Sequence, residues 1–409
     1  MTRAYLRPLA LALAVLAASP AGAQQAPPPE SEVQSLYESA LQSIAEGRKN
    51  DASATLMRVI EKEPLHAGAY LEVALIQCSL GRTDEAERLF AIVETRFNPP
   101  PGILALIAEA RETGCDKWQG LSSSSVSFGR GYDRNVNQGA NNPIFVNVDT
   151  LDRLLPEFLP KSDQYSVVTA DHMRELAPGG TIGFAQFQGR RNDKLSEYDS
   201  ATLYLGAEVP YRLGDWTVRA TGLVGLVGLG GQFYQRQLQG QARVTPPLPL
   251  PAGMQFHLLA SVTNTAYLTL ANFNADTYEL RGQFNYRKDD WYANATLGVQ
   301  TDRARDMRPG GDRAGYAINL LARRKLGDAL IGEIGASRQR WNGSEMYLPG
   351  LIDIVRDQRT DVLRAAWTYQ LTKAQSVQLE ARAIRNKETI SFFAYDNRQV
   401  QLSWQLQMP

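Results

Sequence analysis

From Leu121 onward, apolar and polar residues alternate along segments of about ten residues. In the segment 377–383, Val-Gln-Leu-Glu-Ala-Arg-Ala, every second residue is apolar and the others are polar. The same alternation recurs in 201–209, 278–286 and 400–406. Successive side chains of a strand point to opposite faces, so each segment presents one face to an apolar medium and one to water. The pattern predicts a transmembrane antiparallel β-barrel of about 14 strands in residues 121–409.

The connections between these segments alternate in length. Short connections at 213–215, 287–290, 325–328 and 371–374 separate longer polar loops, such as 301–313 and 341–357. Bacterial outer-membrane barrels have short periplasmic turns and long extracellular loops. With an even number of strands, the first and the last strand both have their free chain end on the periplasmic side. A β-sandwich also alternates, but its strands average about five or six residues, shorter than many of these segments.

Aromatic residues near the segment ends are expected to form the two girdles that mark the membrane interfaces. They are Tyr132, Tyr165, Trp216, Trp291, Tyr292, Trp341, Tyr347 and Tyr395.

The first thirty residues indicate export. Arg3 and Arg7 precede a short apolar run at 9–18, and Ala21-Gly22-Ala23 is a small-residue cleavage site, so we expect a signal peptide at 1–23 and a linker at 24–30. The apolar run is too short to span a bilayer as a helix. The chain has 43 basic and 43 acidic residues, and cleavage would remove the basic Arg3 and Arg7. The mature chain would then have no excess of basic residues, so its charge does not indicate binding to nucleic acid.

Residues 31–115 contain an internal repeat with a period of 34 residues, the period of the tetratricopeptide repeat. The residues related by this offset are Ala40, Ala74 and Ala108, with the pairs Gly47/Gly81, Ala52/Ala86, Leu56/Phe90 and Val59/Val93. We expect about two and a half helix-turn-helix repeats in a periplasmic domain, ending in a capping helix at 101–113. The chain is therefore predicted to be an α+β multidomain protein, with a helical repeat domain before the barrel.

Stacked repeats form a concave face from their first helices, and that face commonly contacts a partner. Tyr37, Leu71 and Glu109 are the candidate cargo-docking residues at these positions. Leu41 and Leu75 share the face but are at least as well explained by packing against neighbouring helices. The only cysteines are Cys78 and Cys115, and an oxidising compartment would allow a disulfide, although a buried free Cys78 is slightly favoured.

The segment 131–137, Gly-Tyr-Asp-Arg-Asn-Val-Asn, directly follows the first predicted strand and begins a long polar loop. After helical repeats and before about 14 strands, it resembles the start of the barrel domain in the surface lipoprotein assembly modifier (Slam) family. The matching positions are Gly131, Tyr132, Asp133, Asn135, Val136 and Asn137. Two features depart from the family: the repeat domain is short, and the chain ends in Leu-Ser-Trp-Gln-Leu-Gln-Met-Pro rather than on an aromatic residue.

The resemblance implies an outer-membrane translocation or assembly factor that delivers lipoproteins or secreted proteins to or across the cell surface. Its expected partners are periplasmic lipoprotein or secreted protein cargo, the barrel assembly machinery and outer-membrane lipid, and we expect a monomer. The alternatives are a polysaccharide exporter, which usually carries longer repeat arrays, and a passive diffusion pore, which gives no reason for the repeats.

A barrel of about fourteen strands encloses more space than its own side chains fill. The longest outer loop, 133–162, contains more apolar residues than a solvent-exposed loop would be expected to carry. We expect the stretch 146–160 to form a short helix ending at Pro160 that enters or caps the lumen. The candidate gate residues are Leu151, Leu154, Leu155 and Phe158.

No chemistry of an enzyme is evident. The histidines are His66, His172 and His257, no serine adjoins His172 in the sequence, and the HExxH, CxxC and GxSxG patterns are absent. The glycine-rich run 222–231 lacks a Walker lysine and is predicted to be a strand leading into an outer loop. We therefore expect neither catalysis nor a cofactor or metal.

Overall fold

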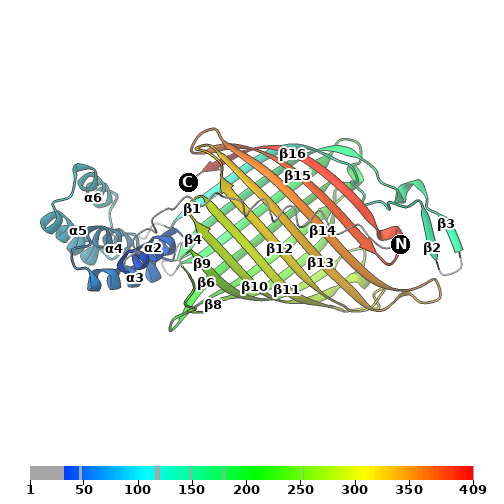
Figure 1. The fold of residues 1–409 in the computed structure, drawn as a ribbon, viewed down its shortest axis with the longest axis horizontal. Helices are drawn as coiled ribbons and strands as arrows, with labels where there is room; N and C mark the ends of the chain where they lie inside the picture. Colours follow the sequence, from blue (N-terminus) through cyan, green and yellow to red (C-terminus); the bar gives the residue numbers. More distant parts are fainter. Residues whose placement is uncertain are drawn as a thin grey trace, which may run out of the picture.

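The computed structural model describes residues 32–45, 48–115, 120–147, 150–177, 180–251 and 253–408. In these ranges, five α-helices precede a closed antiparallel barrel of fourteen strands (Figure 1). The predicted fold class and strand number are confirmed. The signal peptide 1–23 and the linker 24–30 lie outside the described residues. None of the described helices is both long enough and apolar enough to cross a bilayer.

The helices form a small stack whose core uses the repeated positions. Their bounds are α2 Glu32–Ala45, α3 Lys49–Lys62, α4 Ala67–Ser79, α5 Thr83–Phe97 and α6 Pro101–Thr113. Ala40 and Ala74 are completely buried, as are the 34-residue partners Leu56 and Phe90. Small residues let neighbouring helices approach, and the larger ones fill the space between them. Ala108 is exposed, because the chain enters the barrel after α6 rather than continuing with a second helix of that repeat.

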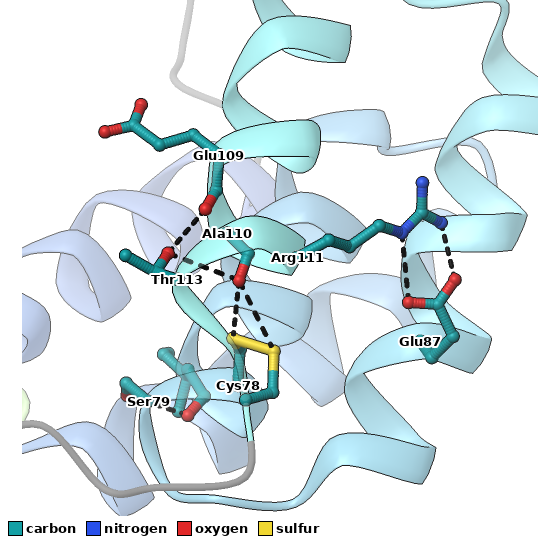
Figure 2. Close-up of a disulfide and its surroundings, with 9 residues drawn as sticks. Cys78, Ser79, Glu87, Glu109, Ala110, Arg111 and Thr113 are labelled. Carbon is teal, nitrogen blue, oxygen red and sulfur yellow. Dashed lines mark hydrogen bonds and ion pairs between the residues drawn. A yellow bond between two sulfur atoms is a disulfide. The ribbon is translucent and has the colours of Figure 1, made fainter.

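A disulfide joins Cys78 to Cys115, so the slightly favoured free Cys78 is wrong. Cys78 lies in the last turn of α4, and Cys115 follows α6 (Figure 2). The sequence could not show that α6 folds back on the core through the fully buried Ile107 and brings the two residues together. Arg111 adds an ion pair of 2.6 Å to Glu87 (Figure 2). A second ion pair of 2.7 Å to Glu94 also holds α6 against α5.

Replacing Cys78 and Cys115 by alanine should destabilise the helical stack without unfolding the barrel. The bond closes a loop across a sequence separation of 37 residues, and loop entropy assigns such a crosslink about 3–4 kcal/mol. In detergent, far-ultraviolet circular dichroism should show helix loss at a lower temperature than in the parent, while the strand signal keeps its midpoint. An unchanged helix midpoint would contradict this role.

The barrel strands follow one another in space as they do in the sequence, and β1 pairs with both β4 and β16 to close the sheet. Their bounds are β1 Ser122–Asp133, β4 Asp163–Ala177, β5 Thr181–Asn192, β6 Ser200–Leu213, β7 Trp216–Leu229, β8 Gln232–Thr245, β9 Met254–Tyr267, β10 Ala275–Lys288, β11 Trp291–Ala304, β12 Arg313–Lys325, β13 Leu330–Leu348, β14 Ile352–Gln370, β15 Gln375–Glu388 and β16 Tyr395–Met408. The end of β16 and the helices lie at the same end of the barrel (Figure 1). The short and long connections lead us to expect this end in the periplasm. It is called the periplasmic end below, and the opposite end is called the extracellular end.

Burial in the barrel is inverted relative to a soluble protein. On β15 and β16, the apolar Leu379 and Leu402 point outward and are 43% and 54% exposed. The polar Ser403 and Asn386 point inward and are buried. This is the arrangement of a barrel whose outer face contacts lipid and whose interior is polar.

The predicted aromatic girdles are correct for only some residues. Tyr132, Trp216 and Trp291 point outward and are 37% to 48% exposed. Tyr165, by contrast, is buried in the lumen, where its hydroxyl donates to Gln401 at 3.1 Å. Strand pairing also turns Tyr292 and Trp341 inward. A position near a strand end determines how close a side chain lies to the membrane interface. Whether it points to lipid or to the lumen depends on its place in the alternation along the strand.

The long loop after β1 contains a hairpin instead of the expected helix. Its strands are β2 Ile144–Asn147 and β3 Thr150–Arg153, followed by the 3₁₀ turn η1 Pro156–Phe158. The run Ile144-Phe145-Val146 favours a strand, and Pro156 and Pro160 cannot donate the hydrogen bonds of a longer helix. The hairpin lies beyond the extracellular end of the barrel (Figure 1).

Candidate functional site

The helical stack contacts the barrel through a buried ion pair at the periplasmic mouth. Lys49 Nζ, at the start of α3, lies 3.2 Å from Glu175 Oε2, near the end of β4, and both side chains are less than 10% exposed. The same Glu175 oxygen accepts from the backbone N–H of Leu121 at 3.3 Å. A carboxylate at an inward position next to the chain's entry into β1 therefore anchors the stack. Sequence reasoning missed both residues, because nothing in the local pattern joins position 49 to position 175.

Below this contact lies a cavity of about 1140 Å³. Ser39 and Arg48 line it from the helical stack. Residues of the periplasmic strand ends, mostly on their inward faces, and of the connection between β8 and β9 line the remainder. In its wall, Glu208 Oε1 accepts from Arg219 at 2.6 Å, and Arg243 lies 3.4 Å from Glu208 Oε2. The cavity thus connects the helices to the barrel interior, and its wall combines apolar residues such as Phe184 and Leu223 with these paired charges.

Breaking the Lys49–Glu175 pair on one side should loosen the stack from the barrel. Removing one partner of a buried pair leaves an uncompensated charge and costs about 3–5 kcal/mol, whereas an apolar pair of similar volume is close to neutral. Lys49→Met and Glu175→Leu alone should each speed amide exchange in α2 and α3, measured by hydrogen–deuterium exchange. The double variant should return toward the parent rate. Additive single effects in the double variant would refute the pairing.

The three predicted docking residues lie in different environments. Tyr37 is half-buried with its ring 4.5 Å from that of His66, and burial, followed by the nearby charge of Glu72, raises the pKa of its hydroxyl. Burial also raises the pKa of Glu72. Leu71 packs against the helical core, which is the alternative interpretation for an apolar residue on this face. The side chain of Glu109 is exposed and points away from the disulfide (Figure 2). Their role in cargo docking stays a prediction.

The charged side chains of the lumen neutralise one another. Arginines form ion pairs with inward-facing carboxylates of the same strand, of a neighbouring strand or, for Arg190 and Asp133, of the next strand but one. Arg308 reaches its carboxylate from an outer loop. These pairs are Arg190–Asp133 at 2.7 Å, Arg219–Glu208 at 2.6 Å, Arg281–Glu279 at 2.6 Å, Arg308–Asp302 at 2.9 Å, Arg356–Glu388 at 2.7 Å and Arg364–Glu380 at 2.8 Å. Pairing offsets the cost of holding these charges in the barrel, and it leaves the lumen with no dominant sign of charge.

Two stripes of glutamine line the lumen. The inward positions include Gln235, Gln237, Gln239 and Gln241 on β8, and Gln399, Gln401, Gln405 and Gln407 on β16. In the closed order of strands, β8 and β16 are separated by six strand steps one way and eight the other, so the stripes face each other. Each amide offers two donors and an accepting oxygen. The path between the stripes can therefore hydrogen-bond a polar, uncharged chain along its length.

The motif 131–137 closes the barrel at its outer rim. Asn135 is buried, and its backbone N–H donates to Asp133 Oδ1 at 2.9 Å and Asn397 Oδ1 at 3.1 Å. Its side-chain amide donates to the carbonyls of Gly139 and Asp396. Asn135 thus joins β1, β16 and the first outer loop at the seam where the sheet closes.

The other residues of the motif 131–137 contact the same seam between β1, β16 and the first outer loop. Asp133 Oδ2 accepts from Arg190 at 2.7 Å and from Gln399 at 2.9 Å. Gly131 is required because a Cβ there would lie 2.5 Å from the Tyr165 ring. The remaining three residues are placed as follows: Tyr132 points outward, the N–H of Val136 donates to the Lys161 carbonyl, and Asn137 donates to the carbonyls of Glu157 and Leu159.

Asn135→Ala should weaken the closed barrel. The substitution removes two side-chain donors and the acceptor of the Gly139 N–H, leaving buried backbone groups unpaired at a total cost of about 2–4 kcal/mol. The temperature at which the folded band is lost in heat-modifiable electrophoresis should fall. Asn142→Ala, an exposed position in the same loop, is the control and should leave that temperature unchanged. Equal behaviour of the two variants would contradict the seam role of Asn135.

The gate residues lie at the outer end rather than inside the barrel. Leu155 and Phe158 are 58% and 50% exposed, and Leu154 is half-buried. The side chain of Leu151 lies outside the description. Phe145 of the hairpin contacts Phe392 of another outer loop, with ring centroids 5.2 Å apart. The described residues of this segment are not seen inside the lumen, and a capping role stays a prediction.

Strand pairing does place a serine beside His172, contrary to the sequence interpretation. Ser124 Oγ lies 2.9 Å from His172 Nδ1, on the outward face of β1 and β4. Among the described residues no carboxylate bonds this ring, and Asp171 points to the opposite face toward Ser125. The described part of the chain also holds no group of three metal-ligating side chains.

No family model and no curated protein matches the chain. Solved structures with a similar barrel include an anion-selective porin from Comamonas acidovorans, at 10% identity, covering 71% of this chain and 99% of the porin with a TM-score of 0.39. OmpT, an outer membrane protein of Vibrio cholerae, matches at 8% identity, 71% and 98% coverage and a TM-score of 0.38. A bacterial polysaccharide outer membrane secretin matches at 8% identity, covering 71% of this chain and 99% of the secretin with a TM-score of 0.38. Similarity this remote leaves the function to be argued from the chain's own residues.

Proposed function

We propose that this protein is an outer-membrane conduit that receives a lipoprotein or secreted protein in the periplasm and delivers it to or across the cell surface. The observation that carries the proposal is the helical stack at the periplasmic mouth, held by Lys49 and Glu175 above a cavity of about 1140 Å³. A stack in this position meets periplasmic cargo before the lumen does. The motif at 131–137 adds the resemblance to the surface lipoprotein assembly modifiers.

The proposal assigns separate tasks to the two parts of the chain. The helices dock cargo, with Tyr37, Leu71 and Glu109 as candidate contacts, and the barrel provides the path. No bond is made or broken, so the protein needs neither a catalytic group nor a cofactor. The barrel assembly machinery inserts the chain, which then acts as a monomer surrounded by outer-membrane lipid.

A polysaccharide exporter is the second candidate, and the glutamine stripes favour it. A neutral glycan carries hydroxyl groups along its whole length, and facing amides can bond them without fixed charge. An extended polypeptide backbone can use the same amides. A passive diffusion pore is less well supported, because helices anchored at one mouth would obstruct free passage.

A surface comparison of whole cells tests the proposal. A strain lacking this protein would be complemented with the full chain or with a chain lacking residues 31–115, and intact cells would be treated with protease. Mass spectrometry should show one or a few lipoproteins or secreted proteins reduced at least tenfold at the surface, with unchanged total amounts. The chain without 31–115 should fail to restore them.

The controls separate transport from barrel assembly. Each complementing barrel must give a heat-modifiable band in the outer membrane, so that loss of transport is not loss of the barrel. An unchanged surface proteome would refute protein delivery. If a surface polysaccharide disappears while surface proteins stay unchanged, the second candidate is correct.

A further inference from the structure

A row of basic residues crosses the outward face of three neighbouring strands. Arg340 on β13 is directly opposite Arg359 on β14, and Arg359 is directly opposite Lys387 on β15. All three share the outward face with apolar residues such as Ile334, Leu363 and Leu379, because they lie an even number of residues from them along their strands. Directly opposed side chains of a sheet are about 5 Å apart at Cβ, and like charges there are destabilising.

The adjacent row is built differently. Arg338, Asp361, Arg385 and Asp396 are opposite one another in that order, so their charges alternate. Arg338 pairs with Asp361 at 2.6 Å, and Arg385 with Asp396 at 3.8 Å. The charges of this row balance one another. The basic row has fewer acidic partners: Asp357 lies 2.6 Å from Arg340, and Asp361, which also pairs with Arg338, lies 3.2 Å from Arg359.

The basic row therefore keeps a positive surplus. In the described part of the chain, Lys387 is exposed and forms no ion pair, and neither does Arg398 nearby on β16. The outward surface of β13 to β16 around the row carries six basic residues against three acidic ones: Arg338, Arg340, Arg359, Arg385, Lys387 and Arg398 against Asp357, Asp361 and Asp396.

The height of the row matches the outer membrane interface. Arg340, Arg359 and Lys387 lie ten, eleven and twelve residues from the periplasmic ends of their strands. With about 3.4 Å per residue and a tilt of about 40°, this places them roughly 26–31 Å above that end, at the top of an apolar band about 25 Å tall. Tyr316, directly opposite Arg340 on β12, is an interfacial aromatic at the same level.

We propose that this row, Arg340, Arg359 and Lys387, binds the phosphate groups of a phosphorylated glycolipid in the outer leaflet. Arginine binds phosphate through two parallel hydrogen bonds, and lysine adds a point charge. The acyl chains of the same lipid would lie against the apolar residues below the row. The anionic headgroup supplies the countercharge that the row lacks within the protein.

The test uses the purified full chain in dodecyl maltoside and bisphosphorylated lipid A as the probe, with native mass spectrometry as the measurement. The variant Arg340→Gln/Arg359→Gln/Lys387→Gln should bind lipid A at least tenfold more weakly than the parent, which corresponds to about 1.4 kcal/mol. The control variant Arg174→Gln/Lys288→Gln/Arg324→Gln removes three exposed basic residues at the periplasmic end and should bind within twofold of the parent.

Chemically altered probes identify the recognised group. Lipid A without its phosphates should bind the parent as weakly as intact lipid A binds the basic-row variant. If the triple variant does not fold, Lys387→Gln alone replaces it, and a several-fold weaker binding is expected. Equal binding of parent and variant, equal binding of the dephosphorylated lipid, or full competition by the same concentration of inorganic phosphate would each overturn the proposal.

Discussion

Closure of the antiparallel ladder is the constraint on which the rest of the structure depends. In a bilayer, each unpaired backbone N–H or carbonyl costs several kcal/mol, so a spanning sheet must have no free edge. Here β1 supplies the closure by pairing with β4 on one side and β16 on the other. The corner at 131–137 holds that seam at its outer rim, where Asn135 bonds both β16 and the outer loop. A motif recognised by family resemblance thus has a direct structural task.

Closure also decides how charge is distributed. A ring of fourteen strands is too wide for its own side chains to fill with an apolar core, so inward residues must be polar and must satisfy one another. The pairs Arg190–Asp133 and Arg364–Glu380 are examples, and the inward amides of β8 and β16 add uncharged hydrogen-bonding groups to the lumen. On the outward face the surplus is basic and lies where lipid headgroups begin. The interior is therefore suited to an uncharged polar chain, and the exterior to an anionic lipid.

Much of the fold could be predicted because its patterns are local. A period of two indicates which residues face lipid, and it correctly separated Leu379 and Leu402 from the polar residues opposite them. The 34-residue offset correctly located buried positions such as Leu56 and Phe90. The candidate site was less accessible to sequence reasoning, since Lys49 and Glu175 meet only after the helices dock on the barrel. The hairpin at 144–153 was also missed, because its apolar residues fit a short helix as well as a strand.

Sequence alone determined the two architectures, the number of strands and the lipid-facing side of the alternating segments, because each follows from a pattern among neighbouring residues. Tertiary structure decided which residues far apart in the chain meet: Cys78 with Cys115, Ser124 with His172, and Lys49 with Glu175. It also placed Arg340, Arg359 and Lys387 in one row. The physical reason is register. The periodicity of a strand is a property of its own residues, whereas the partner of each residue depends on how neighbouring strands align when the barrel closes.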